Sequence, residues 1–187
     1  MFDQTLVRIG ASLDRAEIPY MIVGGQAVLL YGEPRLTRDI DITLGVTLDR
    51  FESLLAVARE LSFKILPEDA AAFVRQTMVL PVLDEVTGIR VDFIFSFTPY
   101  ESEAIRRANR VKILDREVCF AAAEDLIIHK IFAGRPRDIE DVQSVLLKGH
   151  ALDIPYIEKW LNAFDDASDD KQFRSTFRRI AGRLPGG

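Results

Sequence analysis

The sequence predicts an α/β (α+β) protein in which helices and strands alternate along one chain. Three observations lead to this prediction. Apolar residues recur at helical spacing near the N-terminus, at Phe2, Leu6, Ile9 and Leu13. Residues 39–44 alternate polar and aliphatic side chains with the period of a strand, and two apolar runs at 78–83 and 89–95 flank a turn-forming segment typical of a hairpin.

The first half of the chain contains a strand, a glycine turn and the start of a helix. The helix over residues 2–16 precedes the apolar run 18–23, which ends at Gly24 and Gly25. Residues 26–31 then form a short helix that Gly32 ends, and 39–44 form the alternating strand. Helical spacing behind Thr47 predicts a helix over 48–61, and a shorter one is expected over 68–76.

The second half begins with the hairpin of 78–83 and 89–95 and ends in helices. Pro99 favours a helix start, because proline suits the first helical position, and this helix runs to about residue 109. A second, weaker hairpin is expected from 111–114 and 117–120. Helices over 123–133, 138–147, 154–164 and 171–183 complete the chain, and 149–153 is its linker-like segment.

Composition excludes several classes of protein. The 187 residues are 48% hydrophobic and 28% charged, which is typical of a globular domain with at most a small appendage. The net charge of −5 disfavours a broad nucleic-acid-binding surface. The single cysteine, Cys119, cannot form an intramolecular disulfide, and no secretory signal or membrane-spanning run is recognisable. We therefore expect a cytoplasmic protein with no membrane contact.

A glycine pair followed by two aspartates forms the constellation with the clearest chemistry. Gly24 and Gly25, between a strand and a helix, allow close backbone approach and direct free N–H groups toward a phosphate. Asp39 and Asp41 share one face of a strand whose other face is aliphatic. Two such carboxylates would repel each other unless a cation lay between them, and they are suitable ligands for Mg²⁺ that also binds phosphate oxygens.

These residues resemble the signature of the nucleotidyltransferase superfamily with a DNA-polymerase-beta-like core. The matching pattern is Val23-Gly24-Gly25, a spacer and Asp39-Ile40-Asp41-Ile42, and Asp92 in Arg90-Val91-Asp92-Phe93 matches the third carboxylate of the family. The resemblance implies a mixed central sheet flanked by helices and followed by C-terminal helices. It also implies a catalytic domain over residues 1–150 and a helical extension over 151–187. Gly25 stands where many relatives have serine, so a phosphate would be held by backbone N–H groups alone.

A narrower resemblance involves two further segments, Arg35-x-Thr37-x-Asp39-x-Asp41 and the stretch from Glu124 to Asp141. They are similar to AbiEii/AbiGii-type toxin nucleotidyltransferases. Together with the superfamily signature, this resemblance implies that Asp39 and Asp41 hold Mg²⁺, and that Asp92 helps to bind the metal and deprotonates the acceptor. It implies nucleotide binding by a set of five residues: Gly24, Gly25, Arg35, Thr37 and Lys130. The substrate would be ATP or another NTP, and a partner protein of a toxin–antitoxin pair is a further implication.

Several side chains have two interpretations from sequence alone. Lys130 leaves the edge of an apolar helical stripe, so it either contacts a triphosphate or extends along the surface. Arg35 either neutralises phosphate or pairs with Glu33. Asp138 and Asp141 are either ligands or, respectively, a helix cap and a partner of Arg135 or Arg137. His129 and His150 are expected at the surface or an interface, and Trp160 and Phe164 in the core or in a domain contact.

The sequence therefore predicts a Mg²⁺-dependent transfer of NMP from an NTP to an acceptor hydroxyl, with release of pyrophosphate. The acceptor is either RNA such as tRNA or a small molecule. The net charge favours a small cationic acceptor, whereas five basic residues in the last helix favour RNA: Lys171, Arg174, Arg178, Arg179 and Arg183. The alternative function is a non-catalytic nucleotide-binding or partner-binding member of the same fold.

Overall fold

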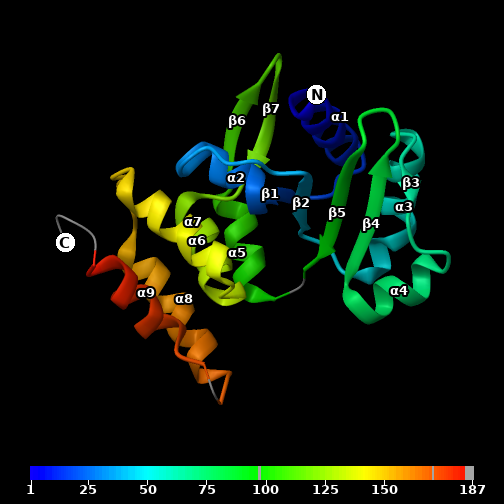
Figure 1. Ribbon diagram of the computed structural model, residues 1–187. Helices are drawn as coiled ribbons and strands as arrows, with labels where there is room; N and C mark the ends of the chain where they lie inside the picture. Colours follow the sequence, from blue (N-terminus) through cyan, green and yellow to red (C-terminus); the bar gives the residue numbers. More distant parts are fainter. Residues whose placement is uncertain (97, 170, 184–187) are drawn as a thin grey trace. The chain divides into compact units, whose positions relative to one another are not determined.

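The chain forms two compact units, which are described separately. Unit 1 comprises residues 1–26 and 36–121, and unit 2 comprises residues 27–35 and 122–187. The computed structural model describes residues 1–96, 98–169 and 171–183 (Figure 1). These units do not coincide with the expected boundary after residue 150, and the division into a catalytic domain of 1–150 and an extension of 151–187 stays a prediction.

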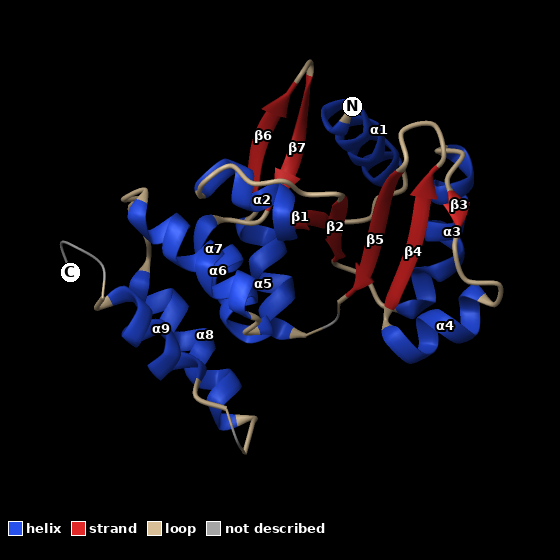
Figure 2. Ribbon diagram, viewed as in Figure 1, coloured by secondary structure: helices blue, strands red, loops and turns tan. Residues whose placement is uncertain are grey.

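Unit 1 contains a seven-stranded mixed sheet with the strand order β3-β4-β5-β2-β1-β7-β6 (Figure 2). The pairs β2–β5 and β1–β7 are parallel, and the other neighbours are antiparallel. The sheet confirms the predicted α/β class and both hairpins. Its strands are β1 (Tyr20–Val23), β2 (Asp39–Leu44), β3 (Lys64–Ile65), β4 (Val79–Asp84), β5 (Ile89–Phe95), β6 (Asn109–Ile113) and β7 (Arg116–Phe120).

The helices of unit 1 present apolar stripes to its core. In α1 (Phe2–Arg15) the residues Leu6, Ile9 and Leu13 are buried, as their spacing predicts. The helix expected over 48–61 is divided into a 3₁₀ turn (Leu48–Arg50) and α3 (Phe51–Glu60). The remaining helices are α4 (Ala70–Thr77), which Asp69 caps through the Ala72 N–H, and α5 (Pro99–Arg107), which Thr98 caps through the Glu101 N–H.

The two faces of β2 differ in the way that the alternation predicts. Ile40, Ile42 and Leu44 are completely buried. Across the parallel ladder they pair with Val91, Phe93 and Phe95 of β5, so both strands present aliphatic or aromatic side chains to the same core. The opposite face of β2 carries Asp39 and Asp41. A fully packed central strand thus fixes the position of two acidic side chains.

Unit 2 is helical. Helix α2 (Gly24–Tyr31) begins in unit 1, and its residues from Ala27 onward belong to unit 2. The other helices are α6 (Ala123–Ala133), α7 (Pro136–Leu147), α8 (Ile154–Asp166) and α9 (Phe173–Ala181). Helix α6 contacts α7, α8 and α9, so it is the central element of this unit. Among the described residues, no helix has the length and apolar character required to cross a membrane.

Candidate active site

Three aspartates of unit 1 lie on the same face of two neighbouring strands. Asp39 and Asp41 are on β2, and Asp92 is on β5. The parallel register pairs Asp41 directly with Asp92, and Asp39 with Arg90. All three aspartates are half-buried. The structure therefore brings together the carboxylates that the sequence motif singles out, although they are far apart along the chain.

Gly24 allows the carboxylate of Asp41 to approach the start of α2. Val23, the residue before it, is the register partner of Asp41 on the antiparallel strand β1. The backbone of Gly24 has φ +63°, and a Cβ atom at this position would lie 1.9 Å from Oδ2 of Asp41. Such a distance is far below van der Waals contact, and the backbone conformation is itself unfavourable for other residues. Only glycine fits here while Asp41 keeps its place.

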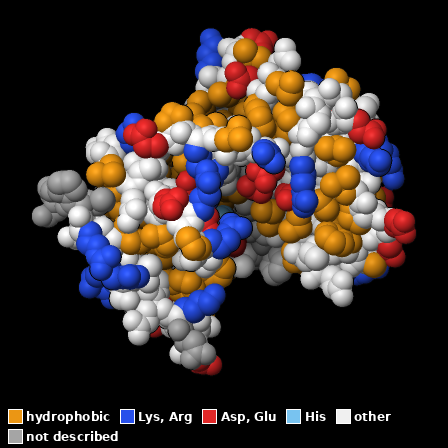
Figure 3. All heavy atoms as spheres, viewed as in Figure 1, with side chains coloured by type: hydrophobic (Ala, Val, Ile, Leu, Met, Phe, Trp, Pro, Cys, Tyr) orange, Lys and Arg blue, Asp and Glu red, His pale blue; other side chains and the backbone are white. Residues whose placement is uncertain are grey.

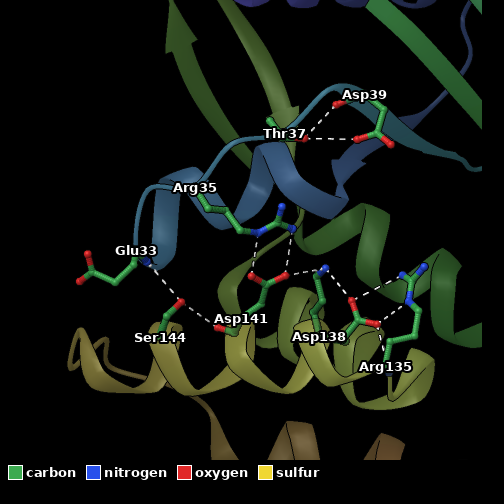
Figure 4. A network of polar contacts seen from close by, with 9 residues as sticks. Glu33, Arg35, Thr37, Asp39, Arg135, Asp138, Asp141 and Ser144 are labelled. Atoms are coloured by element: carbon green, nitrogen blue, oxygen red, sulfur yellow. Dashed lines mark hydrogen bonds and ion pairs between the residues drawn. The ribbon is translucent and has the colours of Figure 1, made fainter.

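Asp39 and Asp92 each have a polar neighbour two residues away. The Thr37 hydroxyl lies 3.2 Å from Oδ1 of Asp39, to which it can donate (Figure 4). The Arg90 Nε donates to Oδ1 of Asp92 at 2.9 Å. This hydrogen bond raises the pKa of Arg90, and the negative charges of Asp92, Asp39 and Asp41 also stabilise its charged form. Arg90 thus interacts electrostatically with all three aspartates.

The residue types and backbone register of this face fit a magnesium site. Mg²⁺ prefers carboxylate oxygens and shares its remaining ligand positions with water or phosphate. Among the described residues, however, no three acidic, histidine or cysteine side chains converge closely enough to hold a metal ion. Asp92 bonds to Arg90 instead, and Asp39 to Thr37. The residue types and the register are those that a magnesium site requires, and the metal site stays a prediction.

In unit 2, Lys130 of α6 lies between two carboxylates of α7. Its Nζ donates to Oδ1 of Asp138 at 2.8 Å and is 2.9 Å from Oδ2 of Asp141. The three side chains are 9%, 3% and 4% exposed, so the contacts are largely shielded from water. The alternative of a surface lysine is therefore wrong. Lys130 is a buried cation with two anionic partners, a hydrogen-bonded one in Asp138 and an ion-paired one in Asp141.

Two arginines extend this network (Figure 4). Arg35 donates from Nε and Nη2 to the two oxygens of Asp141, at 2.8 and 3.0 Å. Arg135 donates to Asp138 from its backbone N–H and its Nε. Burial raises the pKa of Asp138, but the hydrogen bonds from Arg135 and Lys130 outweigh this effect and leave the pKa below its usual value.

These contacts correct two predictions from sequence. If it was not a ligand, Asp141 was expected to pair with Arg135 or Arg137, but its partners are Arg35 and Lys130. Arg35 was expected to pair with Glu33 if it did not bind phosphate, but Glu33 pairs with Lys148. The reason is that sequence proximity does not reveal contacts between the loop after α2 and helix α7. Asp138 does take part in capping α7, as predicted, although from its third helical position.

Four further side chains discussed from the sequence lie in different environments. His129 is half-buried rather than at the surface, and burial together with the charge of Lys130 lowers its pKa to about 4. His150 is exposed, as expected. Burial raises the pKa of the Cys119 thiol, in keeping with a packing role. Phe164 packs against Trp160 and Phe173 in a contact between helices of unit 2, which confirms the expected packing role.

The basic residues of α9 are partly neutralised. Arg178 donates to both oxygens of Glu158 on α8, and Arg174 lies 3.6 Å from the same carboxylate. Asp165 accepts hydrogen bonds from the backbone N–H groups of Phe173 and Arg174, at the start of α9. Two of the five cations that favoured an RNA acceptor are thus engaged with a glutamate of the same unit.

Arg90 is the site residue that sequence reasoning did not assign. Its signal was nevertheless present, because Arg90 and Asp92 are two residues apart on a strand and must share a face. The partners of Lys130 gave a weaker signal, since Asp138 and Asp141 lie on the next helix and the helix-to-helix contact cannot be read from spacing.

Comparison with solved structures shows the same fold in several nucleotidyltransferases. The antibiotic-resistance factor ANT(2'')-Ia, in its solution structure, is 21% identical with a TM-score of 0.57, and the match covers 88% of this chain and 94% of that one. An antigenic nucleotidyltransferase-like protein from Paracoccidioides brasiliensis is 16% identical with a TM-score of 0.53, covering 94% and 91%. The lincosamide antibiotic adenylyltransferase LnuA is 14% identical with a TM-score of 0.50, covering 72% and 89%.

A family model agrees with this structural likeness. No curated protein matches the chain in sequence. The model described as "Nucleotidyltransferase of unknown function (DUF6036)" matches residues 1–181, and these residues include every candidate site residue described above. The narrower resemblance to AbiEii/AbiGii-type proteins stays a prediction. The strand register of the three aspartates and the glycine turn against Asp41 agree with this match. Because the family model covers nearly the whole length, the chain belongs to the DUF6036 family of nucleotidyltransferases and is an enzyme of that class.

Proposed function

We propose that this enzyme transfers a nucleoside monophosphate from Mg²⁺-bound NTP, with ATP as the favoured donor, to a hydroxyl of a small acceptor molecule. The observation that carries the proposal is the register of β2 and β5, which places Asp39, Asp41 and Asp92 on one face beside Gly24. Three carboxylates next to a glycine turn are the groups that metal-assisted phosphoryl chemistry requires.

Each residue has a distinct role in this reaction. Asp39 and Asp41 hold Mg²⁺, and the backbone N–H groups of Gly24 and Gly25 at the start of α2 bind phosphate oxygens. Asp92 contributes to the metal site and accepts the proton of the acceptor hydroxyl. The Thr37 hydroxyl, which contacts Oδ1 of Asp39 without metal, is proposed to bind the nucleotide when Asp39 turns to the metal. When bound, Mg²⁺ stabilises charge on the attacking and leaving oxygens.

The reaction balances as a substitution at phosphorus. The acceptor oxygen forms a bond to the α-phosphorus as its proton moves to the Asp92 carboxylate. The bond between the α-phosphorus and the bridging oxygen breaks, and pyrophosphate leaves with the electron pair of that bond. A carboxylate within hydrogen-bonding reach of the hydroxyl is a suitable general base.

Lys130 and Arg35 are proposed to support nucleotide binding through their positive charge. Asp141 contacts both side chains and orients them, and its negative charge offsets part of their positive charge. We expect Lys130→Ala to raise the KM for NTP with little change in the KM for the acceptor, because a phosphate contact is lost. The matched control is Lys148→Ala, an exposed lysine of unit 2 that pairs with Glu33. An unchanged KM for NTP in Lys130→Ala would assign Lys130 a purely structural role.

Two observations favour a small acceptor over RNA. Several basic side chains lie beside acidic ones on the face shown in Figure 3, although others gather without acidic neighbours, and Arg174 and Arg178 pair with Glu158. ANT(2'')-Ia has been solved with adenylyl-2''-tobramycin, and LnuA with lincomycin, so this fold accommodates small acceptors in those proteins. A toxin–antitoxin role with a partner protein stays a prediction from the sequence resemblance.

The decisive experiment follows label from each NTP in the presence of Mg²⁺, using separate pools of tRNA and of hydroxyl-bearing cationic metabolites. We expect label from ATP in a small molecule, together with pyrophosphate. Label in tRNA would replace the small acceptor by RNA. Failure of Mg²⁺-ATP to bind, measured by calorimetry, would contradict nucleotidyl transfer itself and favour the non-catalytic alternative.

Matched variants separate chemistry from folding in this assay. Asp39→Asn and Asp41→Asn are expected to abolish transfer while the fold remains intact, because each removes a metal ligand from a face where like charges repel. Asp49→Asn is the control, since Asp49 is exposed and lies just beyond β2. Full transfer by Asp41→Asn would contradict the assignment of the metal ligands.

A further inference from the structure

Arg90 is a cation built into the acidic face of unit 1. It lies on β5, two residues before Asp92, and its side chain bonds to the carboxylate of that residue. Its register partner on β2 is Asp39, and Asp41 is the register partner of Asp92. The backbone positions of these four residues therefore form the corners of a square on one face of the sheet, with three acidic residues and one basic residue.

The surroundings direct Arg90 toward this square. On the other side of β5, strand β4 places Leu83 beside Arg90 and Pro81 beside Asp92. Neither of these residues offers a side-chain acceptor, so the guanidinium finds its acidic neighbours on its own strand and on β2. Arg90 compensates the repulsion that three carboxylates on one face would otherwise experience.

The contact also determines where the third carboxylate lies. Although the backbone register is that of a three-carboxylate site, no such cluster is assembled among the described residues. Oδ1 of Asp92 is occupied by Arg90. A divalent cation that takes Oδ1 of Asp92 as a ligand must therefore displace the guanidinium, and one that binds Oδ2 is repelled by the adjacent positive charge.

We propose that Arg90 is a positioning residue that serves as the resident cation of the acidic face, holds Asp92 in the absence of metal and is displaced when the metal–nucleotide complex binds. The inference rests on the metal site of the proposed function and adds to it a reason for nucleotide-dependent metal binding. Without nucleotide, a metal ion binds weakly because Arg90 already neutralises part of the negative charge of the three aspartates. With nucleotide, phosphate oxygens add ligands to the metal ion and favour its replacement of the Arg90 guanidinium.

The exposure of the pair makes such an exchange feasible. The side chain of Arg90 is 53% exposed and that of Asp92 is 19% exposed, so water reaches the guanidinium. Ion pairs with an exposed partner are weak because solvent screens them and competes for their hydrogen bonds. The released guanidinium can therefore be solvated, whereas a deeply buried arginine could not leave without a large penalty.

The test measures Mn²⁺ binding in the full chain, by electron paramagnetic resonance of free Mn²⁺, with and without a non-hydrolysable ATP analogue. Arg90→Gln should bind Mn²⁺ without nucleotide about tenfold more tightly than the wild type, because one repelling positive charge is removed beside the ligands. The stimulation of Mn²⁺ binding by nucleotide should shrink by a similar factor. Arg90→Lys, which keeps the charge, should resemble the wild type.

Arg110→Gln is the matched control, because Arg110 forms an exposed ion pair with Glu117 within the same sheet. We expect it to leave Mn²⁺ binding unchanged. A second readout is thermal unfolding without metal, in which Arg90→Gln should unfold at a lower temperature and Mn²⁺ should restore the difference. This readout also shows whether the variant is folded.

The outcomes distinguish the inference from the proposed function. If the wild type binds Mn²⁺, Asp41→Asn does not, and Arg90→Gln matches the wild type, Arg90 is an ordinary surface ion pair and the inference is overturned alone. Weaker Mn²⁺ binding by a folded Arg90→Gln would also overturn it, because Arg90 would then support the metal. If the wild type binds no Mn²⁺ with or without the analogue, the inference about Arg90 and the proposed metal-dependent function are both wrong.

Discussion

At the scale of single residues, the position of Asp41 depends on the absence of a side chain at Gly24. The carboxylate occupies the space that a Cβ would take, and the left-handed backbone of Gly24 begins the helix at the same point. The sequence predicted a glycine turn beside the acidic strand. It did not predict that the acidic side chain itself requires the glycine, because that contact depends on the register of β1 with β2.

Gly24→Ala should therefore impair both stability and transfer. Gly88→Ala is the matched control, because Gly88 has a similar φ of +69° but no atom within 4 Å of an added Cβ. We expect Gly88→Ala to cost about 1–2 kcal/mol in the free energy of unfolding from backbone strain alone. Gly24→Ala should cost more and lose nucleotide binding. Equal losses in chemical denaturation would mean that Asp41 moves aside freely.

His129 should make unfolding depend on pH. Its pKa is lowered to about 4 in the folded chain, so the unfolded chain binds more protons between this value and the ordinary value near 6.5. Stability is therefore fully present above about pH 6.5 and declines as the pH falls toward 4, by an amount on the order of 1–3 kcal/mol. Denaturant titrations at several pH values measure this slope.

The variant His129→Gln should flatten that part of the pH profile. His150→Gln provides the control, since His150 is exposed and bonds to the Tyr31 carbonyl oxygen. An unchanged slope between pH 4 and 6.5 in His129→Gln would show that His129 does not account for the acid sensitivity, because the lowered pKa of Asp138 affects stability only at lower pH.

At the scale of elements, hydrophobic periodicity predicted the strands and helices that surround the site. The alternation of residues 39–44 predicted both the strand and its acidic face, and the start and end of α6 were predicted at Ala123 and Ala133. The short strand β3 was missed, because two residues give no measurable period. The parallel pairing of β2 with β5 was not derivable from spacing, since a 3₁₀ turn, α3, β3, α4 and β4 lie between these strands along the chain.

The start of helix α9 is capped by a side chain of α8, and this contact can be tested. Asp165 accepts the backbone N–H groups of Phe173 and Arg174, which α9 leaves free at its start. Asp165→Ala should cost about 1 kcal/mol and raise the hydrogen-exchange rate of the α9 amides. Asp166→Ala is the control, because Asp166 contacts only the exposed side chain of Asn162 among the hydrogen bonds described for it. Similar exchange in both variants would contradict the capping role.

At the scale of the whole molecule, the sequence predicted one class of fold and a catalytic core but not the division into two compact units. One boundary between the units lies within α2, which starts at the glycine turn in unit 1 and belongs to unit 2 from Ala27 onward. Residue spacing reveals which side chains share an element. It does not reveal which elements pack together, and this explains why Lys130 was predicted as a cation near a phosphate but not as the centre of a carboxylate network.

Binding of substrate should stabilise the whole chain. A ligand that binds only the folded state adds about 2.7 kcal/mol at a concentration of 100 times its Kd. We therefore expect Mg²⁺ with a non-hydrolysable ATP analogue to raise the unfolding temperature of the wild type and of Asp49→Asn, but not of Asp41→Asn. Without ligand, Asp41→Asn should be at least as stable as the wild type, because like charges are removed. An equal shift in Asp41→Asn would place the nucleotide elsewhere.

The register of β2 with β5 has a consequence for how the protein folds. Contacts between residues far apart in sequence form slowly, because a long loop must close before they contribute free energy. The β4–β5 hairpin and the helices can form from local sequence, but Asp41 meets Asp92 only when the two halves of the sheet join. During refolding, secondary structure should therefore appear before the chain acquires any capacity to capture Mn²⁺, and that capacity marks the last stage of sheet assembly.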